Sequence, residues 1–154
     1  MTVMPLRSRP LFTMELSVGA FLTVGGPEGS ARRIANVLGG TFDGDRMRGI
    51  VLPDGTDWQT LRGDGVVMLD ARVVLKAHDG ALIAMTYAGI RHGPPDVMAR
   101  LTRGEHVDVE SYYFRIAPTF ATSEPRYEWL NRIVAVGTGQ RLPVGPRYDV
   151  HEIL

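Results

Sequence analysis

Alternation of apolar and polar residues is the feature that most constrains the fold of this chain. From Phe12 to Val24 the even positions are apolar, while the odd positions include Thr13, Glu15 and Ser17. Successive side chains of a β-strand point to opposite faces, so a period of two predicts strands with one buried face. No segment of helical period competes with this pattern, so the predicted fold class is all-β.

The spacing of the turn residues predicts the architecture. Strands bounded by Gly, Pro or Asp are expected over residues 12–24, 31–38, 46–52, 65–77, 81–90, 107–116, 133–137 and 147–153. At about eight strands, a sheet closed on itself has an interior that side chains or one small ligand fill. The sequence thus predicts a closed or nearly closed antiparallel β-barrel, with at most one short helix at 96–101. Residues 1–10 are expected to be a tail and 11–154 a single domain.

Composition excludes several functions. The 17 basic side chains balance 17 acidic ones, so no general field draws the protein to nucleic acid or to an anionic membrane. The chain has no cysteine, which excludes disulfides, thiolate metal sites and thiol chemistry. It also shows no signal-peptide pattern and no apolar run of membrane-spanning length. These features predict a cytoplasmic protein without nucleic-acid or membrane partners.

Cofactor and metal motifs are missing as well. The four histidines are scattered, and no two have the spacing that places metal ligands on one strand or helix face. The glycine-rich stretch 25–30 lacks the Gly-Lys-Ser/Thr ending of a phosphate loop, so a turn is expected there. No Gly-x-Ser-x-Gly elbow supports a serine nucleophile. The sequence predicts no metal site and no cofactor.

Charged residues within the strands are the first functional candidates. Asp70 and Arg72 are two apart, so their side chains project from one face, about 7 Å from each other. They could form an ion-pair network that fixes the strand register. They could instead place a carboxylate and a guanidinium on a cavity wall, for acid–base work or anion binding. Tyr113 and Arg115 repeat the spacing, and aromatic residues add to this set: Trp58, Phe120, Tyr127 and Trp129.

Apolar residues on both faces of the 65–77 strand suggest a partner. Val66, Met68 and Val74 lie opposite the row that begins with Val67. A strand that is apolar on both faces is often covered on the outside too, which predicts a homo-oligomer, most simply a dimer.

An ordered series of motifs resembles the bacterial family called domain of unknown function 3237. It comprises GGTFDG at 39–44, RGIVLPDGTDW at 48–58, LDAR at 69–72, DGA at 79–81, YFRIAP at 113–118 and YEWLN at 127–131. The resemblance implies a β-barrel and no settled activity. The matched polar positions are Asp57, Trp58, Asp70, Arg72, Tyr113, Arg115, Tyr127 and Asn131. After Phe120, members of the family often have an acidic residue, whereas this chain has Ala121.

Three hypotheses of function follow from these residues. The first is a small-molecule-binding barrel in which Trp58, Arg72, Arg115, Tyr127 and Asn131 contact the ligand. The second is a cofactor-independent isomerase, cyclase or lyase in which Asp57 or Asp70 is the acid or base and Tyr113 or Tyr127 donates a hydrogen bond. The third is a structural module whose charges form satisfied ion pairs.

Overall fold

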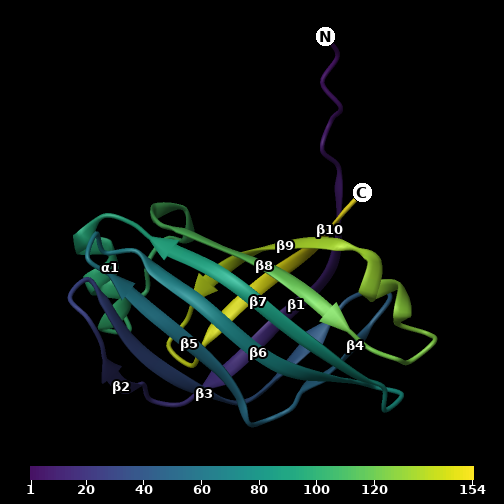
Figure 1. Ribbon diagram of the computed structural model, residues 1–154, viewed down its shortest axis with the longest axis horizontal. Coiled ribbons are helices and arrows are strands. Elements are labelled where there is room, and N and C mark those ends of the chain that lie inside the picture. The colour runs from purple at the N-terminus through teal and green to yellow at the C-terminus, as the bar shows by residue number, and fades with distance from the viewer.

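The strands of the protein form one antiparallel sheet that closes on itself (Figure 1). The computed structural model describes residues 1–154. The strands are β1 (Ser8–Val18), β2 (Leu22–Gly25), β3 (Ser30–Asp43), β4 (Arg48–Val51), β5 (Gly55–Arg62), β6 (Val67–Ala77), β7 (Leu82–His92), β8 (Tyr113–Ala121), β9 (Val134–Arg141) and β10 (Pro146–Ile153). One α-helix, α1 (Pro95–Thr102), and two short 3₁₀ helices, η1 (Val109–Ser111) and η2 (Glu128–Arg132), complete the structure.

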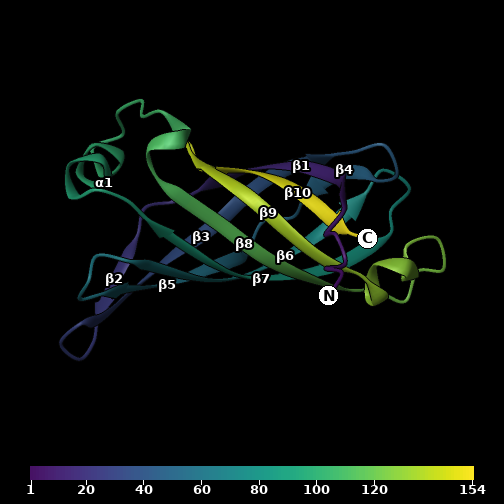
Figure 2. The same ribbon diagram turned by 90° about the horizontal axis from the view of Figure 1, so that it is seen from above.

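The pairing makes this an eight-stranded closed barrel, because two pairs of short strands each fill one position of the ring. β1 and β2 follow one another along one edge of β3, and β4 and β5 follow one another along its other edge. From β6 the ring continues through β7, β8, β9 and β10 back to β1. The predicted closed antiparallel barrel with a single helix is confirmed. In Figure 2, α1 lies at one end of the barrel and η2 at the other.

The first predicted strand is interrupted. β1 ends at Val18, and β2 begins only at Leu22, after a connector that contains Phe21. The prediction that Leu22 and Val24 lie on the inner face is therefore wrong, since both side chains are exposed. The alternation continues through the connector in the sequence, but the backbone shifts register there. At its start, β1 reaches back to Ser8, three residues into the expected tail.

Two segments expected to be loops are strands. The glycine-rich stretch 39–44 continues β3, and Gly39, with a φ of 151°, allows a bend where β3 leaves β5 and begins to pair with β4. The segment with Asp57 and Trp58, expected to be a loop, is β5, which pairs with both β3 and β6. Its inner face carries polar residues, so it lacks the apolar row that marks a strand in the sequence.

The aromatic strand lies later in the chain than expected. Residues 107–112 form an irregular segment with η1, and β8 runs from Tyr113 to Ala121 rather than from 107 to 116. Phe120, placed in a loop by the sequence prediction, is part of this strand and is buried. The helix predicted over 96–101 is confirmed as α1.

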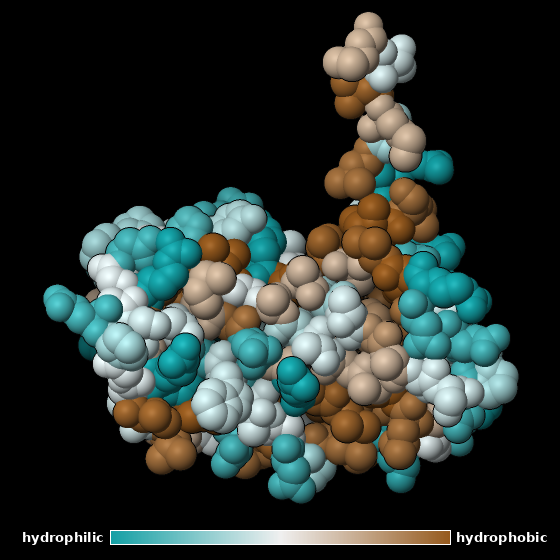
Figure 3. Space-filling view, viewed as in Figure 1, coloured by the Kyte–Doolittle hydropathy of each residue, from teal (hydrophilic) through white to brown (hydrophobic).

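The core fills the barrel with the inward-facing residues of every long strand. Inner rows such as Leu69, Ala71 and Val73 are buried, and the residues between them are exposed. On the outside, hydrophilic and hydrophobic residues are mixed over the wall, and the N-terminal tail is largely hydrophobic (Figure 3). No helix of the protein has the length and apolarity needed to span a bilayer.

Candidate functional site

Three of the predicted site residues face away from the barrel interior. The inner row of β6 contains Leu69 and Ala71, so Asp70 and Arg72 point outward and are exposed. Trp58 has the same orientation on β5 and is 48% exposed. Asp70 and Arg72 take part in none of the ion pairs of the structure, so neither the cavity wall nor the register network expected for them is present.

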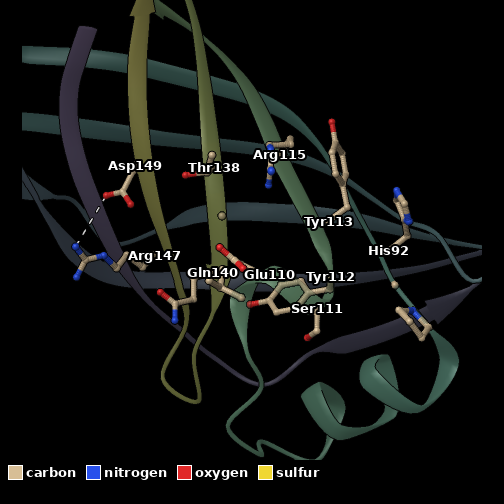
Figure 4. A pocket seen from close by; sticks show the side chains of 14 residues that line it. His92, Glu110, Ser111, Tyr112, Tyr113, Arg115, Thr138, Gln140, Arg147 and Asp149 are labelled. Carbon is tan, nitrogen blue, oxygen red and sulfur yellow. Dashed lines mark ion pairs between the residues drawn. The ribbon is translucent and has the colours of Figure 1, made fainter. Parts of the chain in front are cut away.

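Tyr113 and Arg115 lie on the outer wall, in a groove beside the segment that connects β7 to β8 (Figure 4). The Tyr113 ring stacks on His92 with their centroids 5.1 Å apart. The Arg115 guanidinium lies 4.6 Å from the Tyr113 ring centroid and donates a hydrogen bond of 2.8 Å to the Phe114 carbonyl. The groove has a volume of about 790 Å³.

The charges of this outer groove are open to water. Arg147 and Asp149, both on β10, form an ion pair of 3.9 Å along one side of it, and both side chains are about half exposed (Figure 4). Exposed pairs of this kind contribute little energy, and water screens their fields. The groove offers a surface for weak polar contacts, but it holds no buried acid or base.

Tyr127 and Asn131 serve the opposite end of the barrel. The Tyr127 hydroxyl donates a 2.6 Å hydrogen bond to Asp79, which also pairs with Arg126. The Asn131 amide accepts a hydrogen bond from the Thr122 N–H and donates one to the Thr122 carbonyl. Both residues fasten turns at that end. Ala121, at the end of β8, is exposed in the same region.

Asp57 is the predicted site residue that points inward, and it belongs to a group of polar side chains inside one end of the barrel. Asp57 and Arg91 are only 7% and 4% exposed, respectively. We call this group the interior polar cluster; its members are Arg33 on β3, Asp57 and Gln59 on β5, Arg91 on β7, Arg141 on β9 and Tyr148 on β10.

Hydrogen bonds satisfy only part of the cluster. Arg33 donates from Nε to Gln59 over 2.9 Å, and Gln59 donates to Asp57 Oδ2 over 2.7 Å. The second carboxylate oxygen, Oδ1, is buried without a partner, and so is the Tyr148 hydroxyl. Tyr87 is near enough to affect the pKa of Tyr148, but its geometry is not that of a hydrogen bond. Buried polar atoms are rarely left without partners, so these two mark a place for a further group.

Burial dominates the electrostatics of the cluster. Desolvation raises the pKa of the Asp57 carboxyl, and the Gln59 hydrogen bond and the Arg91 and Arg33 charges offset this only in part. Desolvation and the neighbouring Arg141 charge lower the pKa of Arg91 to about 10, so Arg91 stays charged at neutral pH. Burial also raises the pKa of Tyr148, which keeps its hydroxyl protonated.

The cluster borders a small void of about 10 Å³, whose polar lining consists of Asp57, Gln59, Arg91, Arg141 and Tyr148. This volume holds about one water molecule. Phe21 closes the void from outside, since its ring lies 3.9 Å from the Arg33 guanidinium carbon and 5.6 Å from that of Arg141. A carboxyl, a phenol and guanidinium groups around one void can transfer a proton and stabilise an oxyanion. The structure brings no three His, Asp or Glu side chains close enough to hold a metal ion.

The sequence contains a signal for the residues that the prediction missed. Arg91 lies an even number of residues after the buried residues Ile83, Met85 and Tyr87, so it belongs to the same inner row of β7. Tyr148 likewise shares the inner row of β10 with Val150. A polar residue on an inner row, rather than any charged residue on a strand, is the more informative pattern.

These features define a closed antiparallel barrel with a buried polar cluster inside one end. The chain belongs to the family described as protein of unknown function DUF3237, whose sequence model it matches over residues 6–153. It is 36% identical to the UPF0311 protein RPA1785 of Rhodopseudomonas palustris over 149 residues, 97% of each chain. The crystal structure of RPA1785 superposes with a TM-score of 0.93, covering 99% of this chain and all of that one.

A more distant relative carries a named activity. The hydroalkoxylation enzyme phnH of Penicillium herquei is 27% identical over 148 residues, which cover 91% of this chain and 83% of that protein. A crystal structure of an enzyme from the same organism shares the fold, with a TM-score of 0.76 at 23% identity over 100% of this chain and 98% of that one.

Proposed function

We propose that this protein is a cofactor-independent enzyme of the lyase, cyclase or isomerase class, with its active site at the interior polar cluster. The observation that carries the proposal is the buried Asp57 carboxyl, which lines the void, has a raised pKa and leaves its Oδ1 without a hydrogen-bond partner. A carboxyl with a raised pKa holds a proton more tightly than an ordinary one, so it can accept a proton from a substrate and return it, as general acid–base catalysis requires. Exposed Asp70 and Arg72 offer no comparable group.

The other members of the cluster have matching roles. The Tyr148 hydroxyl, which is protonated and unpartnered, donates a hydrogen bond to an oxygen on which charge develops. Arg91 and Arg141 line the same void and place positive charge beside it. Because the interior excludes water, these charges act more strongly than they would at the surface.

The named relative supports one reaction of this class, the addition of an O–H group across a carbon–carbon double bond. In that addition Asp57 takes the hydroxyl proton, the oxygen bonds to one alkene carbon, and a proton returns to the other carbon. No electron donor or acceptor is needed, so the reaction balances without a cofactor. Ligand binding in the void requires Phe21 to move, because the closed void accommodates only about one water molecule.

Ring closure of a hydroxychalcone tests this proposal, since its phenolic oxygen adds to its own conjugated double bond to give a flavanone. We expect the protein to accelerate closure, measured by loss of the chalcone absorbance, and Asp57→Asn to abolish the acceleration. The control is Asp64→Asn, which changes an exposed carboxyl in the turn between β5 and β6 and should retain the acceleration. Equal rates with Asp57→Asn, or no acceleration by the wild type, would contradict the proposal.

A further inference from the structure

Two guanidinium groups of the interior polar cluster, those of Arg91 and Arg141, line the same void. Neither of them forms any of the ion pairs of the structure. Asp57 lines the void too, but it is one carboxylate in a cluster that contains three arginines. Charges that are buried normally have partners, so the cluster has an excess of positive charge without a counter-ion.

The two groups repel each other. The charge on Arg141 is, after burial, the largest cause of the lowered pKa of Arg91. Arg91 also has an aromatic neighbour, the Phe114 ring, whose centroid lies 5.0 Å from the Arg91 guanidinium carbon. The fold thus keeps two like charges together around a void, at a cost that an anion bound between them would offset.

Phe21 indicates the shape of the missing group. Its ring lies over the guanidinium groups of both Arg33 and Arg141, on a connector that belongs to neither β1 nor β2. A planar ring can therefore occupy the mouth of the barrel in contact with two guanidinium faces, which is a favourable arrangement for arginine. The connector lies outside both strands, between Val18 and Leu22.

We propose that the natural substrate carries a carboxylate, which binds between Arg91 and Arg141 while its planar portion takes the place of the Phe21 ring. Guanidinium groups bind carboxylates through paired hydrogen bonds, so two of them fix both the position and the orientation of the substrate. This assignment rests on the proposed active site and adds the substrate class to it. The carboxylate orients the reacting atoms toward Asp57 and Tyr148.

Benzoate and benzamide test the assignment, because they share a shape and differ in charge. We expect benzoate to bind and benzamide to bind at least about tenfold more weakly, as measured by calorimetry at equal ionic strength. Arg141→Gln should weaken benzoate by a similar factor and leave benzamide unaffected. Arg32→Gln is the matched control, since Arg32 precedes Arg33 on β3 and is exposed. Circular dichroism checks that each variant is folded.

The outcomes separate this inference from the proposed function. If benzoate fails to bind at millimolar concentration, binds no better than benzamide, or binds Arg141→Gln as well as it binds the wild type, the carboxylate assignment is overturned. Asp57→Asn should keep or strengthen benzoate binding, because it removes a nearby negative charge. Loss of chalcone closure in Asp57→Asn together with equal binding of the two probes would retain the acid–base site and reject the carboxylate. Selective benzoate binding without closure of a hydroxychalcone that also carries a carboxylate would do the reverse.

Discussion

At the scale of the residue, Asp57 has a stability effect opposite to that of an ordinary surface carboxylate. Between its ordinary pKa of 3.8 and its raised pKa, the folded state binds more protons than the unfolded state. The contribution of this group to stability therefore falls as the pH rises through that window. We expect Asp57→Asn to be at least as stable as the wild type at neutral pH, and the wild type to gain on it as the pH is lowered toward 3.8 in urea titrations.

Asp64 provides the control with the opposite sign. Its hydrogen bond with Arg62 lowers the pKa of its carboxyl, so its stabilising effect is present above the ordinary pKa and is lost as the pH falls through the lowered one. The wild type should then lose stability relative to Asp64→Asn on acidification. If Asp57→Asn follows this same trend, the pKa of Asp57 is not raised in the folded protein.

Gly139 shapes the wall of the site through its lack of a side chain. A Cβ atom there would lie 2.7 Å from Cγ of Phe114, whose ring packs edge-on against Tyr148. Gly139→Ala should therefore displace both rings and cost about 1–3 kcal/mol of unfolding free energy in urea titrations. Thr138→Ala, next to it on the outer face, should change stability by less than about 0.5 kcal/mol. Similar values for the two variants would contradict the packing described here.

At the scale of the element, β6 tests which face of the wall is inside. Leu69 is buried, and its neighbour Asp70 is exposed without an ion pair. Leu69→Ala should cost about 2–5 kcal/mol of unfolding free energy, because it leaves a cavity in the core. Asp70→Ala should stay within about 0.5 kcal/mol and should not affect chalcone closure. A large loss of unfolding free energy in Asp70→Ala would support the register network that the sequence suggested.

The strands could be predicted wherever their inner face is apolar. The inner row of β6 is apolar throughout and those of β7 and β10 are mostly apolar, and the positions of these strands in the sequence prediction agree with the structure to within a few residues. β5 was missed because Asp57 and Gln59 interrupt such a row, and the rule of alternation takes the buried face to be apolar. The same interruption makes this face useful for chemistry. The strand that carries Asp57 was thus the one that the pattern was least able to detect.

The Phe21 connector controls access to the void if the site binds as proposed. Removing its ring in Phe21→Ala exposes the Arg33 and Arg141 guanidinium groups that it covers. We expect benzoate to associate faster with Phe21→Ala, and to bind it more tightly, because no ring has to be displaced first. Stopped-flow mixing measures the rate, and Leu22→Ala, an exposed neighbour on β2, is the control. An unchanged association rate would place the entrance elsewhere.

At the scale of the whole molecule, closure of the barrel was predictable and the site was not. The number of strands and their turns indicate a closed sheet, since each signal is local to a few residues. The cluster instead joins Asp57, Arg91, Arg141 and Tyr148 from β5, β7, β9 and β10, which meet only when the ring closes. The odd or even position of a residue in its strand gives the face on which its side chain lies. The position of that side chain along the barrel axis depends instead on the register of several strand pairs.

The outer wall carries the last prediction, which concerns assembly. An apolar groove of about 600 Å³ runs across the wall from β6 to β10, and Met68, Ile90 and Val136 line it. We propose that a second copy of the chain covers this face in a symmetric dimer, which typically buries about 1,200–2,000 Å² in total. Sedimentation velocity should show a dimer, and Val136→Glu should shift it to monomer by placing a charge in the contact. Val24→Glu, on the exposed strand β2 away from the groove, should leave the dimer intact. A wild-type monomer at micromolar concentration, or a dimer insensitive to Val136→Glu, would show that this face is free.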